Sequence, residues 1–222
     1  MKSTYPLFRR VIEFVLLFAL FFLSGRKCLA EVPDSKKLAA DIRQKYEAIE
    51  TFSATYRLEY AWMQADRTNV EEGTIEYAKG DRFKLQLGTQ VIISDGKSLW
   101  RYSKDNKQVI IENLKDVNKE ILPSNIIFNY LNMFSIESIS ETVYDENPVF
   151  HLKLKSADKS SPNAITNACI GANDLILRKL ERVDESGNKT AIYLSDIKVN
   201  HAIADDTFTF QIPEDITIHD LR

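Results

Sequence analysis

The sequence has few of the residues that build most catalytic and cofactor sites, with 7 glycines, 3 histidines and 2 cysteines among 222 residues. It contains no Gly-rich phosphate-binding loop and no G-x-S-x-G nucleophile motif. The histidines, His151, His201 and His219, stand at none of the spacings that hold a metal ion. These absences predict a protein that is not an enzyme, that uses no cofactor and that has no metal site.

Basic residues are also not in excess. The chain has 29 Lys and Arg against 32 Asp and Glu, so its formal net charge is −3. Nucleic-acid-binding proteins usually carry a basic patch, and nothing in this balance predicts one. The proportions of hydrophobic residues (44%) and charged residues (27%) are those of a globular protein, and they exclude collagen-like or wholly disordered chains. The length suits a single domain, which we expect to be a monomer.

The first thirty residues differ from this average. A basic start is followed by the apolar run 14–23 and by a small residue at Ala30. This order is typical of a secretory signal peptide, predicted over 1–30, with 31–222 as one exported domain. The alternative is a membrane anchor, which needs about 20 apolar residues, whereas this run has ten. Removal of 1–30 would leave an excess of seven acidic residues.

The two cysteines predict neither lipidation nor a disulfide. Arg26 and Lys27 directly precede Cys28, where a lipoprotein signal has small residues. After cleavage Cys169 would be the sole thiol, and we expect it to be inert in a polar loop with a short strand near 165–170.

The spacing of hydrophobic residues changes along the chain, from that of a helix to that of a strand. Leu38, Ile42, Tyr46 and Ile49 recur at helical spacing and predict a helix over 34–50, capped by Asp34 or by the next serine. From residue 53 the period becomes two, which predicts strands. The expected strands lie in 53–112, 136–155, 175–182, 190–199, 208–212 and 216–218. Asp95-Gly96 between two of them predicts a hairpin turn.

Short helices are expected between the two strand regions, over 114–122 and 125–133. About eleven strands are more than one flat sheet holds comfortably, and we therefore predict a strongly curved or barrel-like antiparallel sheet packed by helices. We therefore expect a mainly β fold that also contains a few helices (α+β).

Large apolar side chains are concentrated on the predicted strands. Tyr60, Trp62, Phe83, Leu85 and Trp100 are sufficient to line one concave face. They can form an ordinary packed core or a cavity for an apolar ligand, and periodicity alone does not distinguish the two.

Three stretches resemble the LolA family, the periplasmic carriers of outer-membrane lipoproteins. The first is the hairpin 93–102 (ISDGKSLWRY) with Gln108 after it. The second is 208–213 (FTFQIP) followed by ITI, which is similar to the end of the family's sequences. The third is the N-terminal helix that runs into 49–54 (IETFSA). The resemblance extends over about 34–222.

This resemblance implies an incomplete antiparallel barrel closed by a helical lid, with a cavity that holds acyl chains. The helix 125–133 would belong to the lid, and Phe128 and Leu131 would face the cavity. In the family a basic residue, an Arg followed by Pro, latches the lid. Lys79 is the matching residue here and Arg82 is its neighbour, but Lys cannot make the forked contacts of Arg.

The function implied by the resemblance is that of a soluble periplasmic carrier. It would take acylated lipoproteins from an inner-membrane ABC-type exporter and pass them to an outer-membrane acceptor similar to LolB. Alternatives are a periplasmic regulator of the same fold that senses lipids or lipoproteins, a carrier of another lipid, and a lipid-anchored acceptor. The missing lipoprotein signal disfavours the last of these.

Overall fold

The computed structural model describes residues 33–118, 122–156 and 165–222. Residues Pro33–Arg222 form one compact unit. The predicted signal peptide, together with Cys28, lies outside the described residues, as does part of the short helix expected over 114–122. Within that expected helix, the structure shows one 3-10 turn at Leu114–Asp116.

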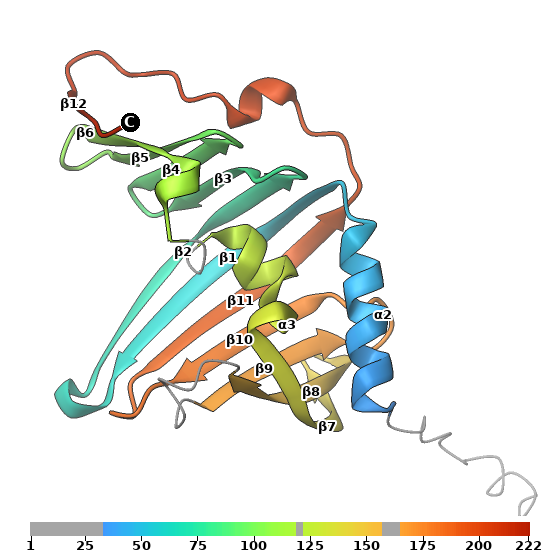
Figure 1. Ribbon diagram of the computed structural model, residues 1–222. Coiled ribbons are helices and arrows are strands. Elements are labelled where there is room, and N and C mark those ends of the chain that lie inside the picture. The colour runs from blue at the N-terminus through green and yellow to red at the C-terminus, as the bar shows by residue number, and fades with distance from the viewer. Residues whose placement is uncertain (1–32, 119–121, 157–164) are drawn as a thin grey trace, which may run out of the picture. The chain divides into compact units, whose positions relative to one another are not determined.

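A single curved sheet dominates the unit (Figure 1). In the described residues it has twelve strands in the order β12-β6-β5-β4-β3-β2-β1-β11-β10-β9-β8-β7. Their bounds are β1 (Thr51–Trp62), β2 (Arg67–Ala78), β3 (Arg82–Leu87), β4 (Gln90–Asp95), β5 (Ser98–Ser103), β6 (Gln108–Asn113), β7 (Phe134–Tyr144), β8 (Asn147–Ser156), β9 (Ile165–Gly171), β10 (Leu177–Val183), β11 (Lys189–Val199) and β12 (Thr217–Asp220). Neighbours are antiparallel except β12, which runs parallel to β6. The predicted mainly β, curved antiparallel fold is confirmed.

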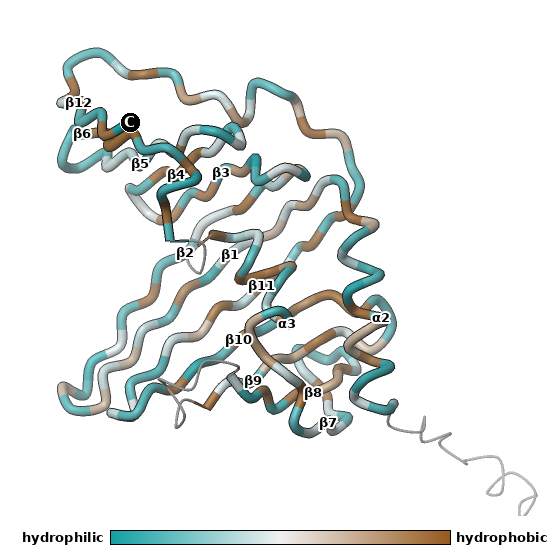
Figure 2. Tube along the Cα trace, viewed as in Figure 1, coloured by the Kyte–Doolittle hydropathy of each residue, from teal (hydrophilic) through white to brown (hydrophobic). Residues whose placement is uncertain are grey.

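Hydrophobic and hydrophilic residues alternate along many of these strands (Figure 2). Because side chains of successive strand residues point to opposite faces, the alternation gives the sheet one apolar face. We call this the inner face. In Figure 1 the helix α2 runs along one side of the sheet and α3 lies over the inner face.

Helix α2 (Ser35–Glu47) forms where the sequence predicts it. The carboxylate of Asp34 accepts hydrogen bonds from the backbone N–H groups of Lys36 and Lys37, at 2.9 and 3.1 Å. Its apolar stripe is buried against the inner face. The helix ends three residues earlier than expected, with Ala48 as its C-cap.

The second helical segment is broken, unlike the predicted helix over 125–133. A π-helical turn, Ser124–Phe128, is followed by α3 (Tyr130–Met133), and the N–H of Asn129 bonds the carbonyl oxygen of Ser124 at 3.0 Å. Phe128 and Tyr130 are both buried. Two residues so spaced lie on nearly opposite sides of a regular α-helix, and in the broken segment both are buried. We call 124–133 the lid segment.

Two other predictions were wrong in detail. The expected strand over 208–212 is instead a 3-10 turn, Asp205–Phe208, and an irregular run, because Phe208 and Phe210 pack against side chains of the sheet rather than joining its edge. The short strand expected near 165–170 is confirmed as β9, but Cys169 lies buried within it rather than in a polar loop. Burial raises the pKa of its thiol.

Candidate functional site: a lidded apolar face

The first strands build the floor of the site. Register brings Phe52, Tyr77 and Phe83 side by side across β1, β2 and β3, and all three are buried. The next row along the same strands contains Ile75 and Leu85, which are also buried. This floor is therefore apolar and continuous across three strands.

Phe128 of the lid segment closes this floor. Its ring centroid lies 4.5 Å from that of Tyr77, 5.2 Å from that of Phe52 and 5.6 Å from that of Tyr46. Leu131 is 5% exposed and belongs to the same buried cluster. Burial raises the pKa of Tyr77 to about 12, and the nearby carboxylates of Asp81 and Glu50 act in the same direction. The phenols beneath the lid are therefore neutral at physiological pH.

A cavity of about 240 Å³ remains between the lid segment, α2 and β2. Tyr77, Phe128 and Leu131 form part of its wall, and Lys79 and Arg43 also line it. Ligand pockets usually measure about 300–1,000 Å³. This cavity is smaller than that, so a long acyl chain could occupy the inner face only if the lid segment moved.

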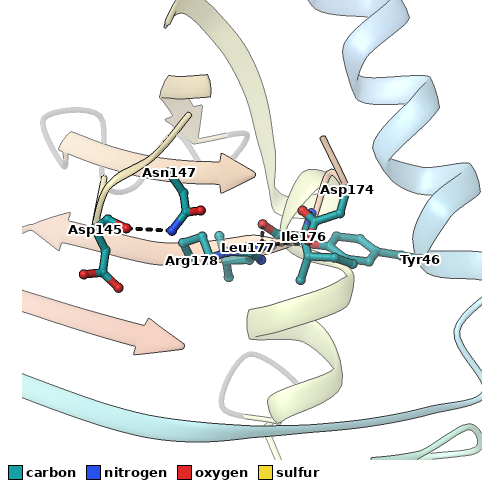
Figure 3. Close-up of polar contacts among 7 residues, drawn as sticks. All are labelled: Tyr46, Asp145, Asn147, Asp174, Ile176, Leu177 and Arg178. Atoms are coloured by element: carbon teal, nitrogen blue, oxygen red, sulfur yellow. Dashed lines mark hydrogen bonds and ion pairs between the residues drawn. The ribbon is translucent and has the colours of Figure 1, made fainter. Parts of the chain in front are cut away.

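Helix α2 is fixed to the sheet on the other side of this cavity. The Tyr46 hydroxyl oxygen accepts a hydrogen bond at 2.9 Å from the N–H of Leu177, at the start of β10 (Figure 3). Asp174 and Arg178 form an ion pair beside this contact. Burial raises the pKa of Tyr46 above its ordinary value. Helix α2 therefore forms a fixed wall.

The two residues predicted to latch the lid contact other elements. The Lys79 Nζ lies 2.7 Å from the Glu50 carboxylate and donates to the Glu47 carbonyl oxygen at 3.2 Å. A positive charge at that place stabilises the C-terminal end of α2. Arg82 lies 3.2 Å from the Asp205 carboxylate and over the ring of Phe208. Arg82 therefore holds the C-terminal segment.

A residue that the sequence analysis did not single out contacts the lid segment. The Arg43 Nη2 donates a hydrogen bond of 2.9 Å to the Leu131 carbonyl oxygen. These residues are 88 positions apart. Arg43 directly follows Ile42 of the predicted apolar stripe, but that pattern does not say which distant carbonyl a basic residue will meet.

The remaining predicted lining residues lie elsewhere. Tyr60 and Trp62 extend the inner-face row of β1, and their rings stack at 6.1 Å, but they are 39% and 42% exposed. Trp100 was predicted to line the concave face, but it lies on the opposite face of the sheet. It pairs with Ile93 and packs at 6.4 Å against Phe210, whereas its neighbours Leu99 and Arg101 face inward. A period of two specifies which residues share a face but not which strands lie under the lid.

The described residues contain no cluster of His, Cys, Asp or Glu that could hold a metal ion. Among the same residues, no helix combines the length and apolar character needed to cross a bilayer. The apolar floor and the lid segment over it form an arrangement that can cover apolar groups.

Known proteins are similar to this chain in sequence or in fold. The outer-membrane lipoprotein carrier protein of Wigglesworthia glossinidia brevipalpis is 26% identical over 222 residues, which cover 97% of this chain and 98% of that protein. That of Chromohalobacter salexigens is 25% identical over 189 residues, covering 83% and 86%. The crystal structure of an uncharacterized conserved protein from Thermus thermophilus matches with a TM-score of 0.56 at 14% identity, covering 84% and 99%. The family model described as "Outer membrane lipoprotein carrier protein LolA" matches residues 47–211. Since that match spans well over half of its length, the chain belongs to the LolA family.

Proposed function

We propose that this protein carries lipoproteins through the periplasm by covering their acyl chains on the inner face. The observation that supports the proposal most directly is the apolar floor beneath a small lid segment, in a member of the LolA family. Phe83, Leu85, Phe128 and Leu131 would contact the acyl chains. Tyr60 and Trp62 would extend this surface beyond the lid segment.

The energetics favour lid opening by cargo. A buried methylene group contributes about 0.8 kcal/mol, so an acyl chain of ordinary length gains about 10 kcal/mol on leaving water. Exposing one phenylalanine side chain costs about 1.5–3 kcal/mol. The free energy gained by covering one acyl chain is therefore larger than the cost of exposing Phe128. When the chain leaves, burial of Phe128 favours closure of the lid segment again.

The remaining steps of the proposed cycle follow from the family. Residues 1–30 would direct export and be removed, and 31–222 would act as one soluble domain, without a cofactor or catalysis. The cargo would arrive from an inner-membrane ABC-type exporter and leave to an outer-membrane acceptor similar to LolB. A monomer with one inner face would carry one cargo molecule at a time.

Binding of a triacylated lipopeptide tests this function. We expect a 1:1 complex with a peptide that carries an N-terminal triacylated cysteine, and no complex with the same peptide lacking acyl groups. Gel filtration with a fluorescent peptide measures both. Equal binding of the two peptides, or of neither, would refute the carrier function.

Arg43→Gln tests the contact that holds the lid segment. Loss of the bond to the Leu131 carbonyl removes about 1 kcal/mol from the closed state, so amide exchange in 124–133 should accelerate roughly fivefold. Hydrogen–deuterium exchange measures this effect, and lipopeptide uptake should become faster. Gln44→Ala, an exposed neighbour on α2, is the control. Unchanged exchange in Arg43→Gln would show that the bond does not hold the lid segment.

A further inference from the structure

A second cavity opens on the other side of the Arg43 bond. It measures about 500 Å³ and lies between α2, the end of the lid segment and the start of β7. Its apolar lining comes from Ala39, Leu131, Phe134 and Ile136, while Lys36 and Arg43 also line it. We call it the α2 groove. Arg43 and Leu131 line both cavities, so their hydrogen bond lies between the α2 groove and the interior.

The charge of the α2 groove differs from that of its surroundings. Helix α2 carries four basic and two acidic residues, although the whole chain has net charge −3. Each of the other three described cavities has at least one carboxylate in its lining. The α2 groove has none, and its charged lining residues are both basic.

Two carboxylates near the α2 groove, those of Asp34 and Glu137, already have partners. Asp34 accepts hydrogen bonds from two backbone N–H groups at the start of α2. Glu137, next to Ile136, pairs with Lys153 at 2.8 Å, and this pairing lowers the pKa of Glu137. The basic side chains of the groove therefore keep the capacity to bind an external anion.

From this combination we propose that the α2 groove binds an anionic phospholipid of a membrane surface, beyond the interior site for cargo. The acyl chain of the lipid lies on the apolar lining, and its phosphate meets Lys36 and Arg43. Long basic side chains suit this position because their stems cover apolar surface while their charges remain in water. Basic residues near an anionic bilayer attract it, and that attraction is screened by salt.

Such a contact would orient the protein during loading. The net negative charge repels an anionic bilayer, so the basic groove is the side that approaches it. The lid segment borders the same groove and would then face the lipid surface. Docking would remain weak and reversible, as a carrier that must leave the membrane requires.

Vesicle co-sedimentation tests the proposal. We expect the wild-type protein to bind vesicles of phosphatidylglycerol and phosphatidylcholine at low salt, and not vesicles of phosphatidylcholine alone. Lys36→Glu should weaken binding about tenfold, since it replaces an attraction with a repulsion. Lys104→Glu, in the exposed β5–β6 turn, makes the same charge change far along the sheet order and should have little effect. Ala39→Glu, which places a charge on the apolar lining, should also weaken binding.

Three results would overturn the proposal. They are equal loss of binding in Lys104→Glu, equal binding to phosphatidylcholine vesicles, and displacement of the vesicles by millimolar inorganic phosphate at constant ionic strength. Lipopeptide binding in solution is measured on the same variants. Lys36→Glu should retain it, so failure of the groove and failure of the carrier function give different results.

Discussion

Replacing Phe128 with alanine should lower the free energy of unfolding by about 3–5 kcal/mol, the usual cost of removing a buried aromatic ring. The ring lies within 6 Å of the centroids of Tyr46, Phe52 and Tyr77, which belong to α2, β1 and β2. Its loss removes ring contacts between the lid segment and all three elements at once. Urea denaturation followed by circular dichroism measures the change.

The same variant separates two roles of this ring in binding. Phe128→Ala loses one contact with the acyl chains, but no ring has to leave the floor that the chains would cover, so the variant should bind the triacylated lipopeptide at least as tightly as the wild type. Phe134→Ala, which removes a partly buried ring beside the lid segment, is the control and should cost less stability. Binding weakened more than about tenfold would instead show that the contact of Phe128 with the bound chains outweighs the cost of moving its ring off the floor.

Alanine at Gly73 should have an effect of similar size for a different reason. A Cβ atom there would lie 1.7 Å from the backbone oxygen of Gln86, on the neighbouring strand β3. Because backbone rather than a flexible side chain is in the way, β2 and β3 must move apart. We expect a loss of about 3 kcal/mol or more, with faster amide exchange in β3.

Gly88→Asn is the matched control for this substitution. Gly88 has φ +52°, and a Cβ atom added there would meet no other atom within 4 Å. Asparagine tolerates this left-handed conformation, so the change should cost less than about 1 kcal/mol. Equal thermal stability of Gly73→Ala and the wild type would show that the strands adjust without loss of pairing.

Local signals predicted much of the fold. Asp34 caps α2, and Asp95-Gly96 joins β4 to β5 with Gly96 at φ +90°. Each feature depends on hydrogen bonds or backbone angles within a few residues. Within the region 53–112, residues 67–72 are polar except for Val70 and show no alternation of their own, and they become the first half of β2 through pairing with β1.

The candidate site was predicted only in part: the strand pattern supplied Phe83 and Leu85, and the family resemblance supplied Phe128 and Leu131. Phe128 and Leu131 belong to the lid segment, and Phe83 and Leu85 lie on the floor, in the same buried cluster. Trp100 has the same aromatic character but faces away from them. Composition therefore identified side chains able to cover an acyl chain, and strand register decided which of them face inward.

By itself the sequence determined the alternation of the strands, the capped helix α2 and the scarcity of residues for catalysis, because these depend on residue type and near-neighbour spacing. The tertiary structure decided that Lys79 stabilises α2, that Arg82 holds the C-terminal segment and that Arg43 reaches the lid segment. Each of these contacts joins residues far apart in the chain. The partner of a charged side chain is set by where the packed sheet places the nearest acceptor, and that position is a property of the whole fold.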